Sequence, residues 1–232
     1  MERVAVLLFG GRGIRFGENK PKQFVLLGEH PLCYYAASSL NASEHIDKIV
    51  AVSDKGSINE LSAILYGKYQ FGKVKAVIPG GSTRQESVYL ALKYLKSQGE
   101  SPDSLILIQD GDRPNLTTAL IKENVETAQT YGASVTAIPA TDSLLYAEDN
   151  EAGEYLKRDK VYQVQTPQCF RFDWIYKAHT LARNRGLSFT DDASTLPLIG
   201  KSAHLVLGSK DNLKITTTID AEIFLKENIH ET

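Results

Sequence analysis

Short apolar runs rich in branched side chains alternate along the chain with longer segments whose apolar positions recur at helical spacing. The short runs predict buried strands, and the longer segments predict amphipathic helices. The predicted strands cover residues 4–9, 49–52, 74–78, 105–108 and 135–138. Strands that alternate with helices favour an α/β fold, with a mostly parallel sheet that carries helices on both faces.

The clearest helix start lies at Thr83, which precedes Glu86 at capping-box spacing. In this motif the threonine hydroxyl and the glutamate carboxylate each accept a backbone N–H group at the helix start. Val88, Ala91 and Leu92 then follow at helical spacing. We therefore expect a helix from this point onward.

The pattern loosens between residues 139 and 162. A brief apolar run there leads into polar turn residues at 148–153, which favours a hairpin that projects from the core. The chain contains no long internal repeat, low-complexity tract or linker. We therefore expect residues 1–232 to form one domain with a projecting arm at about 139–162.

Composition and charge narrow the class of protein. The chain has 232 residues, of which 42% are hydrophobic, and a formal net charge of −2. Nucleic acids and anionic membranes require a broad basic surface, so neither is an expected partner. No apolar run approaches the roughly 20 residues that cross a bilayer. Cys33 and Cys169 lack metal-type spacing, and no secretory start precedes them, which favours the reducing cytoplasm.

The first predicted strand runs directly into a loop that is rich in glycine and arginine. Because glycine has no Cβ, the backbone N–H groups at Gly11 and Gly13 can approach an anion closely. Arg15 and Lys22 add side chains that bind phosphate oxygens. The loop has neither the Rossmann dinucleotide spacing nor the Walker lysine. On composition alone, a phosphate cradle and a solvated basic turn remain equal alternatives.

A second glycine turn precedes the helix predicted at Thr83. Gly81 lies in this turn, where the free N–H groups of the helix start favour polar or anionic ligands. Ser82 and Thr83 are better explained as helix caps. Ser87 lies inside the helix, where capping does not explain it, and is a candidate ligand-binding residue.

Carboxylates follow the predicted strand 105–108. Asp110, Asp112 and Arg113 emerge at its carboxyl end, the edge at which open α/β sheets bind ligands. Carboxylate oxygens suit Mg²⁺, so Asp110 is the candidate metal ligand, although Asp-Gly near Pro114 is also an ordinary turn signal. Lys214 is predicted inside an apolar-flanked strand, where an unpaired charge is costly, and this marks it as a candidate site residue.

Two further patterns have structural interpretations. Thr190 or Asp191 is expected to cap a helix that begins near this point. The five histidines show neither paired metal-ligand spacing nor a neighbouring nucleophile motif. We expect each of them to be a surface or structural residue.

Seven motifs follow one another in order along nearly the whole chain. They are Gly11-x-Gly13-x-Arg15, Pro21-Lys22-Gln23, Gly81-x-x-Arg84-x-x-Ser87-Val88, Asp110-x-x-Arg113-Pro114, Gln165-Thr166-Pro167-Gln168, Thr190-Asp191-Asp192-Ala193 and Asp211-Asn212-x-Lys214-Ile215-Thr216. In this order they resemble the 2-C-methyl-D-erythritol 4-phosphate cytidylyltransferases. The set is far more specific than any one of its members.

The resemblance implies a Rossmann-like, three-layer nucleotidyltransferase fold, with CTP and a small polyol phosphate as substrates, Mg²⁺ as cofactor and a homodimer formed through the arm. It implies that Arg15 and Lys22 stabilise the transition state. It also implies that Arg158 and Lys214 position the polyol phosphate, with Arg158 serving the site of the partner subunit. The other substrate contacts that it implies are Gly11, Gly13, Gly81, Ser87, Arg113, Ser143 and Thr166.

Departures from the family pattern leave the acceptor open. The start of the loop at residues 9–11 and the run 162–166 are more similar to ribitol-5-phosphate cytidylyltransferases, whereas 190–194 is similar to the methylerythritol enzymes. Gln109 stands where the family usually has histidine, and Asp112 stands where it has a small apolar residue. A non-catalytic nucleotide-binding homologue is a third alternative, which the complete set of basic residues disfavours.

Overall fold

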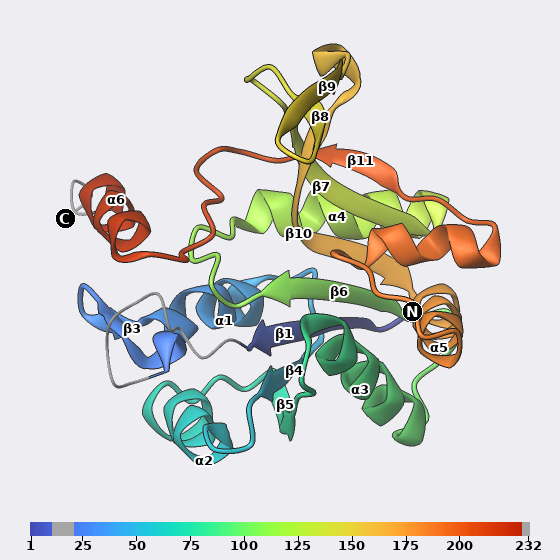
Figure 1. Ribbon diagram of the computed structural model, residues 1–232. Coiled ribbons are helices and arrows are strands. Elements are labelled where there is room, and N and C mark those ends of the chain that lie inside the picture. The colour runs from blue at the N-terminus through green and yellow to red at the C-terminus, as the bar shows by residue number, and fades with distance from the viewer. Residues whose placement is uncertain (11–20, 229–232) are drawn as a thin grey trace.

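The computed structural model describes residues 1–10 and 21–228, so the candidates Gly11, Gly13 and Arg15 lie outside the described residues. Its main sheet has seven strands in the order β11-β7-β10-β6-β1-β4-β5 (Figure 1). The five strands predicted from the apolar runs are confirmed. They correspond to β1 (Arg3–Phe9), β4 (Lys48–Ser53), β5 (Val74–Pro79), β6 (Leu105–Asp110) and β7 (Ala133–Pro139).

The sheet is mostly parallel, as predicted. Strand β1 pairs in parallel with β4 and β6, β4 with β5, and β7 with β11 (His204–Leu207). Strand β10 (Tyr162–Arg171) runs antiparallel between β6 and β7. The carboxyl ends of β1, β4, β5, β6 and β7 therefore meet at one edge of the sheet, together with the amino end of β10.

Helices cover both faces of this sheet and make three layers (Figure 1). Side chains of β1 alternate between the faces, with Leu7 in one buried cluster and Val6 in the other. The Leu7 face carries α1 (Leu32–Ala42), α2 (Ile58–Ser62), the π-helix η3 (Ala63–Lys68) and α4 (Thr118–Tyr131). The Val6 face carries α3 (Arg84–Ser97), α5 (Phe172–Asn184) and the 3-10 helix η5 (Ala193–Ile199).

A smaller apolar cluster fixes the segment that carries Lys214. The cluster contains Val25, which follows η2 (Lys22–Phe24), Leu27 of β2 (Leu26–Leu27) and Leu32 of α1, together with Ile215 and with Ala221 and Phe224 of α6 (Thr218–Asn228). Strand β2 pairs with β3 (His30–Pro31). The predicted strand around Lys214 is wrong, because this segment is irregular. Ile215 is fully buried in the small cluster, and its N–H group donates to the carbonyl oxygen of Asp112 at 2.8 Å.

Two helix starts were predicted, at Thr83 and at Thr190 or Asp191, and the structure matches the first more closely than the second. The Thr83 hydroxyl accepts the N–H of Glu86 at 3.0 Å, as expected, but the Glu86 carboxylate accepts the N–H of Ser82 instead of that of Thr83. At the second site η5 begins only at Ala193. Asp191 still accepts a backbone N–H group there, from Ser194 at 3.1 Å.

The predicted arm contains a hairpin of β8 (Leu145–Glu148) and β9 (Glu151–Tyr155), which projects from the sheet (Figure 1). Asp149 and Asn150 join its strands with φ of 50° and 66°, the left-handed values that tight hairpin turns require. The short helix η4 (Arg158–Lys160) then leads into β10. Every residue of β8 and β9 is exposed.

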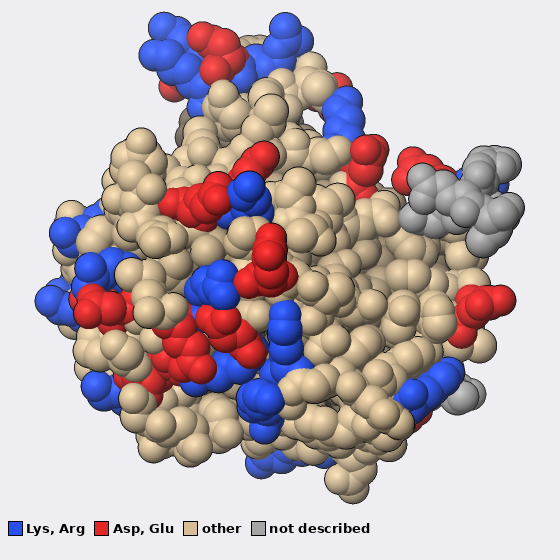
Figure 2. Space-filling view, turned by 180° about the vertical axis from the view of Figure 1, so that it is seen from behind, with Lys and Arg blue, Asp and Glu red and all other residues tan. Residues whose placement is uncertain are grey.

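Charged residues are mixed over the face that Figure 2 shows. Lysine and arginine lie beside aspartate and glutamate on the body of the molecule and on the arm, so no single sign dominates this face. Within residues 1–10 and 21–228, no helix combines the length and the apolar character that crossing a membrane requires.

Candidate active site

A cavity of about 570 Å³ opens at the carboxyl edge of the sheet. The turn between β5 and α3 forms one wall, and the ends of β1, β4 and β6 form its floor. Lys214 reaches it from the segment that precedes α6. The residues that line the cavity are Leu8, Gly10, Val52, Ser53, Asp54, Gly80, Gly81, Ser82, Thr83, Arg84, Ser87, Asp110, Asp112 and Lys214.

A larger cavity, of about 830 Å³, lies between α4, β11 and the end of α6. Its described lining includes the carboxylates of Glu123, Asp211 and Glu227 but no lysine or arginine. Such a lining repels a polyanion. We therefore assign the site to the smaller cavity, where basic side chains and carboxylates converge.

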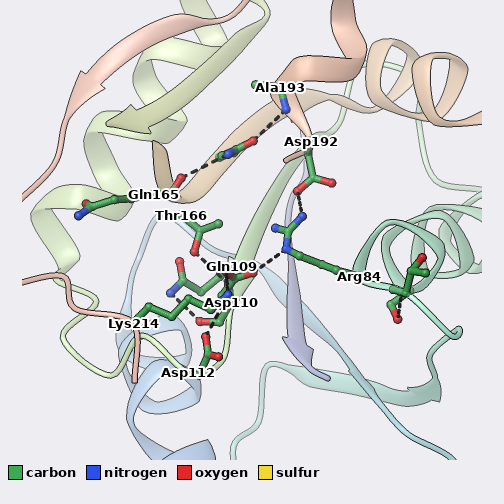
Figure 3. Close-up of polar contacts among 12 residues, drawn as sticks. Arg84, Gln109, Asp110, Asp112, Gln165, Thr166, Asp192, Ala193 and Lys214 are labelled. Carbon is green, nitrogen blue, oxygen red and sulfur yellow. Dashed lines mark hydrogen bonds and ion pairs between the residues drawn. The ribbon is translucent and has the colours of Figure 1, made fainter. Parts of the chain in front are cut away.

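Asp110 is the centre of the ion pairs in this site (Figure 3). Its Oδ1 lies 2.9 Å from Nε of Arg84, and its Oδ2 lies 2.7 Å from Nζ of Lys214. Burial by itself raises the pKa of the Asp110 carboxyl, but the cations of Arg84 and Lys214 outweigh it and hold the pKa well below its usual range. Asp110 is therefore a carboxylate at neutral pH.

Lys22 makes a second ion pair beside the cavity. Its Nζ lies 2.6 Å from Oδ2 of Asp112 and also donates to the carbonyl oxygen of Ile215 at 2.7 Å. Asp112 and Gly10 line the cavity and also a small adjoining cleft that contains Lys22. The structure thus brings Lys22 and Lys214, from opposite ends of the chain, to neighbouring carboxylates.

Arg84 connects the cavity to a buried aspartate before η5 and, through it, to α5. Its Nη1 lies 2.8 Å from Oδ2 of the buried Asp192, whose Oδ1 lies 3.2 Å from Nε2 of the buried His179. Burial by itself lowers the pKa of Arg84, but Asp192 and Asp110 raise it above its ordinary value. The guanidinium is held between the two carboxylates (Figure 3).

Gly81 and Ser87, two of the predicted substrate-binding residues, both lie in the wall of the cavity. The Ser87 hydroxyl accepts the N–H of Gly81 at 3.1 Å and donates to the carbonyl oxygen of Thr83 at 2.9 Å. A Cβ on Gly80 would lie 2.7 Å from the Ser87 oxygen, so this close approach requires glycine. Ser87 therefore shapes the glycine turn in addition to lining the cavity.

Thr166 and Arg113 lie next to the site and contact the residues that surround it. The Thr166 hydroxyl accepts the N–H of Asp110 at 3.1 Å, and Nη1 of Arg113 donates to the carbonyl oxygen of Asn212 at 2.6 Å. Burial lowers the pKa of Arg113, although Asp110 and Asp112 oppose this effect. Neither side chain lines the cavity. Both brace the strand and the turn that carry Asp110.

Ser143 and Arg158 lie apart from the other candidates. Both are exposed near the base of the arm, and Nη1 of Arg158 donates to the carbonyl oxygen of Thr141 at 3.2 Å. The cavity of the same chain is lined by neither residue. Side chains exposed on the arm can reach the site of a second subunit, which is the role that the family resemblance implies for them.

The carboxylates of the cavity suit a divalent cation that keeps part of its water shell. Among the described residues, no three side chains of His, Cys, Asp or Glu gather closely enough to enclose a metal ion. Mg²⁺ does not require such an enclosure, because it retains waters and binds one or two carboxylates together with substrate phosphates. The ionised Asp110 at the cavity wall fits that role.

Sequence reasoning did not select Arg84, Asp192 or His179 as site residues. Arg84 and Asp192 occur in the family motifs, and an arginine in the first turn after a glycine loop was an available signal. His179 was expected to be structural, and its buried contact with Asp192 agrees with that expectation. Its connection to the cavity follows only from the fold.

The three-layer fold and the cavity at the carboxyl edge, in which arginine and lysine side chains meet carboxylates, are those of a nucleotidyltransferase. The family model for 2-C-methyl-D-erythritol 4-phosphate cytidylyltransferase matches residues 4–227. The chain belongs to this family, which confirms the resemblance of the ordered motifs and makes it a cytidylyltransferase.

Several enzymes of this family are similar to the chain over almost its full length. The chain is 37% identical to the 2-C-methyl-D-erythritol 4-phosphate cytidylyltransferase of Clostridium acetobutylicum, over 97% of each chain. It is 36% identical to that of Halalkalibacterium halodurans, over 98% of each chain. The crystal structure of the Francisella tularensis enzyme has a TM-score of 0.82 and 26% identity, and covers 97% of this chain and 98% of its own. The Thermus thermophilus enzyme has a TM-score of 0.74 and 27% identity, with 96% of each chain covered.

Proposed function

We propose that this chain transfers a cytidylyl group from CTP to 2-C-methyl-D-erythritol 4-phosphate, giving 4-diphosphocytidyl-2-C-methyl-D-erythritol and pyrophosphate in isoprenoid precursor biosynthesis. The observation that carries the proposal is the convergence of Lys22 and Lys214 on Asp112 and Asp110 at the carboxyl edge of the sheet. Two anionic substrates repel each other, and such a site neutralises and aligns them.

The reaction requires no nucleophilic side chain. The phosphate of the acceptor is already ionised and attacks the α-phosphorus of CTP in line, while pyrophosphate leaves with the bridging electron pair. In this proposal Lys22 and Arg15 stabilise the charge of the transition state, and Lys214 orients the acceptor phosphate. Gly11, Gly13, Gly81 and Ser87 contact CTP, whereas Arg113 and Thr166 hold the acceptor side of the site in shape.

Asp110 would hold Mg²⁺, which when bound supplies positive charge to the triphosphate. The support for this role is the ionised carboxylate at the cavity wall, between Arg84 and Lys214. Those two cations keep Asp110 deprotonated and fix its orientation. Removal of the divalent cation by a chelator is expected to abolish turnover.

The proposed active form is a homodimer in which the arm of one subunit supplies Arg158 and Ser143 to the site of the other. Exposed aromatic residues on the arm support this assembly, since Tyr146 and Tyr155 are 64% and 65% exposed in the single chain. Burial of these rings against a second subunit stabilises a dimer. The single-domain organisation and the cytoplasmic location stay predictions.

The named relatives favour the methylerythritol acceptor over ribitol 5-phosphate and over a non-catalytic role. The test incubates the protein with CTP, Mg²⁺ and each polyol phosphate in turn and measures pyrophosphate release. Release with 2-C-methyl-D-erythritol 4-phosphate supports the proposal. Release only with ribitol 5-phosphate would change the acceptor, and no release with either would make the protein a binding homologue.

A further inference from the structure

Asp112 contacts both of the lysines that are proposed to bind substrate. Its Oδ2 lies 2.6 Å from Nζ of Lys22, and its Oδ1 lies 3.7 Å from Nζ of Lys214. Only 14% of the Asp112 side chain is exposed, and Oδ1 is a buried atom that accepts no hydrogen bond from the described residues. The carboxylate is thus held at the cavity wall with spare capacity to accept a hydrogen bond.

The turn before Asp112 leaves this carboxylate little freedom. Gly111 packs directly on Phe9, and a Cβ at this position would lie 2.4 Å from the phenyl ring. The N–H of Gly111 donates to the carbonyl oxygen of Leu8 at 2.8 Å, and the carbonyl oxygen of Asp112 accepts from Ile215 at the same distance. Backbone bonds on both sides therefore fix the residue that holds the lysines.

The described cations in and beside the cavity are all paired with carboxylates. Arg84 and Lys214 contact Asp110, whereas the one charged partner that the described residues give Lys22 is Asp112. The other acceptor of Lys22 is the neutral carbonyl of Ile215. A phosphate that binds Lys22 must therefore compete with Asp112, and its negative charge is repelled by the same carboxylate.

We propose that Asp112 is a counter-ion that substrate phosphates displace, and that it sets the affinity of the site for them. It orients Lys22 and Lys214 while no phosphate is bound, and then yields them to phosphate oxygens. The inference rests on the proposed function, since it takes this cavity to be the one that binds phosphates. It makes Asp112 a positioning residue and an affinity-determining residue.

A rival interpretation makes Asp112 only a structural tether between η2 and the segment that carries Lys214. The two interpretations predict opposite changes. If Asp112 competes with phosphate, removing its charge tightens anion binding. If Asp112 only tethers, removing its charge loosens both lysines and weakens anion binding.

The experiment titrates inorganic pyrophosphate, without metal, into the full chain by isothermal calorimetry at low ionic strength. We expect Asp112→Asn and Asp112→Ala each to lower the Kd about tenfold, the change that roughly 1.4 kcal/mol of relieved repulsion produces. The gain is expected to shrink at high salt. Glu123→Gln removes one charge from the exposed surface of α4, and we expect it to leave the Kd unchanged.

Steady-state kinetics give a second readout. A repulsion felt equally by the bound substrate and the transition state affects KM and not kcat. We therefore expect the KM for CTP to fall about tenfold in Asp112→Asn, with kcat changed by less than about threefold. An unchanged or raised pyrophosphate Kd in variants that retain the wild-type melting curve overturns the inference. Because this titration needs no turnover, an inactive wild type would reject the proposed function and leave the role of Asp112 to be decided by the Kd.

Discussion

The carboxylate of Asp192 lies 2.8 Å from the guanidinium of Arg84, although the two residues are 108 positions apart in the sequence. The same guanidinium contacts Asp110, 2.9 Å away on its other side. A buried aspartate beside α5 thus helps to fix where an arginine of the candidate active site points.

Removing Asp192 is expected to affect stability and activity together. Asp192→Ala leaves Arg84 without one partner inside the protein, and breaking such a buried pair costs about 3–5 kcal/mol. Loss of Arg84 orientation is expected to lower kcat/KM by about 10- to 100-fold. Urea unfolding and steady-state kinetics measure the two effects. The neighbouring Asp191→Asn keeps its Oδ1 acceptor and serves as the control, and equal losses in both variants would contradict this role of Asp192.

The stability of the protein at acid pH is expected to depend on the ionised carboxylates of Asp192 and Asp110. Burial raises the pKa of the Asp192 carboxyl, but Arg84 and His179 outweigh it, so the pKa lies below its ordinary value, like that of Asp110. In the unfolded chain an aspartate takes up its proton near pH 3.9, so below that pH the unfolded state binds more protons. The stability that these two ionised aspartates contribute is fully present above about pH 3.9. It is lost as the pH falls from there toward their lower pKa values in the folded protein.

The measurement is the free energy of unfolding in urea between pH 6 and pH 2. Each depressed aspartate contributes a slope of about 1.4 kcal/mol per pH unit below pH 4. We expect Asp192→Asn to lower the slope of the wild type by about that amount. An unchanged slope would show that Asp192 is not a depressed carboxyl.

Lys22 is expected to act mainly in the transition state. Lys22→Ala is predicted to lower kcat by about 10²–10³, as loss of a single preorganised donor does in other enzymes. The Kd for CTP is expected to change much less, because only interactions that strengthen in the transition state accelerate the reaction. Direct CTP titration beside steady-state kinetics separates the effects. Equal losses in binding and turnover would reduce Lys22 to a ground-state phosphate contact.

The proposed exchange of arms can be tested by mixing two inactive variants. Arg158→Ala lacks the arm contact, and Lys214→Ala lacks a contact in the body of its own subunit. In a mixed dimer one of the two sites regains both residues, so subunit exchange is expected to restore about a quarter of the wild-type activity. No recovery after verified exchange would place Arg158 in the site of its own chain.

Much of the fold could be predicted because its parallel strands are buried on both sides and appear as apolar runs. Strand β10 escaped prediction because Gln163, Gln165 and Gln168 interrupt its apolar pattern. Lys214 was selected because a strand was predicted around it, but it reaches the cavity from an irregular segment that the small cluster around Ile215 holds in place. Asp192 lies in a family motif, but its pairing with Arg84 and the contact of His179 with Asp192 could not be predicted, because only the packing of α5 and η5 creates them.

Turnover of CTP with 2-C-methyl-D-erythritol 4-phosphate and Mg²⁺ tests the central claim most directly. The purified protein is expected to release one pyrophosphate for each 4-diphosphocytidyl-2-C-methyl-D-erythritol formed, with Lys22→Ala and Lys214→Ala greatly impaired. Turnover that both substitutions leave unchanged would contradict the assigned site. Absence of turnover by a folded, CTP-binding wild type would contradict the proposed activity itself.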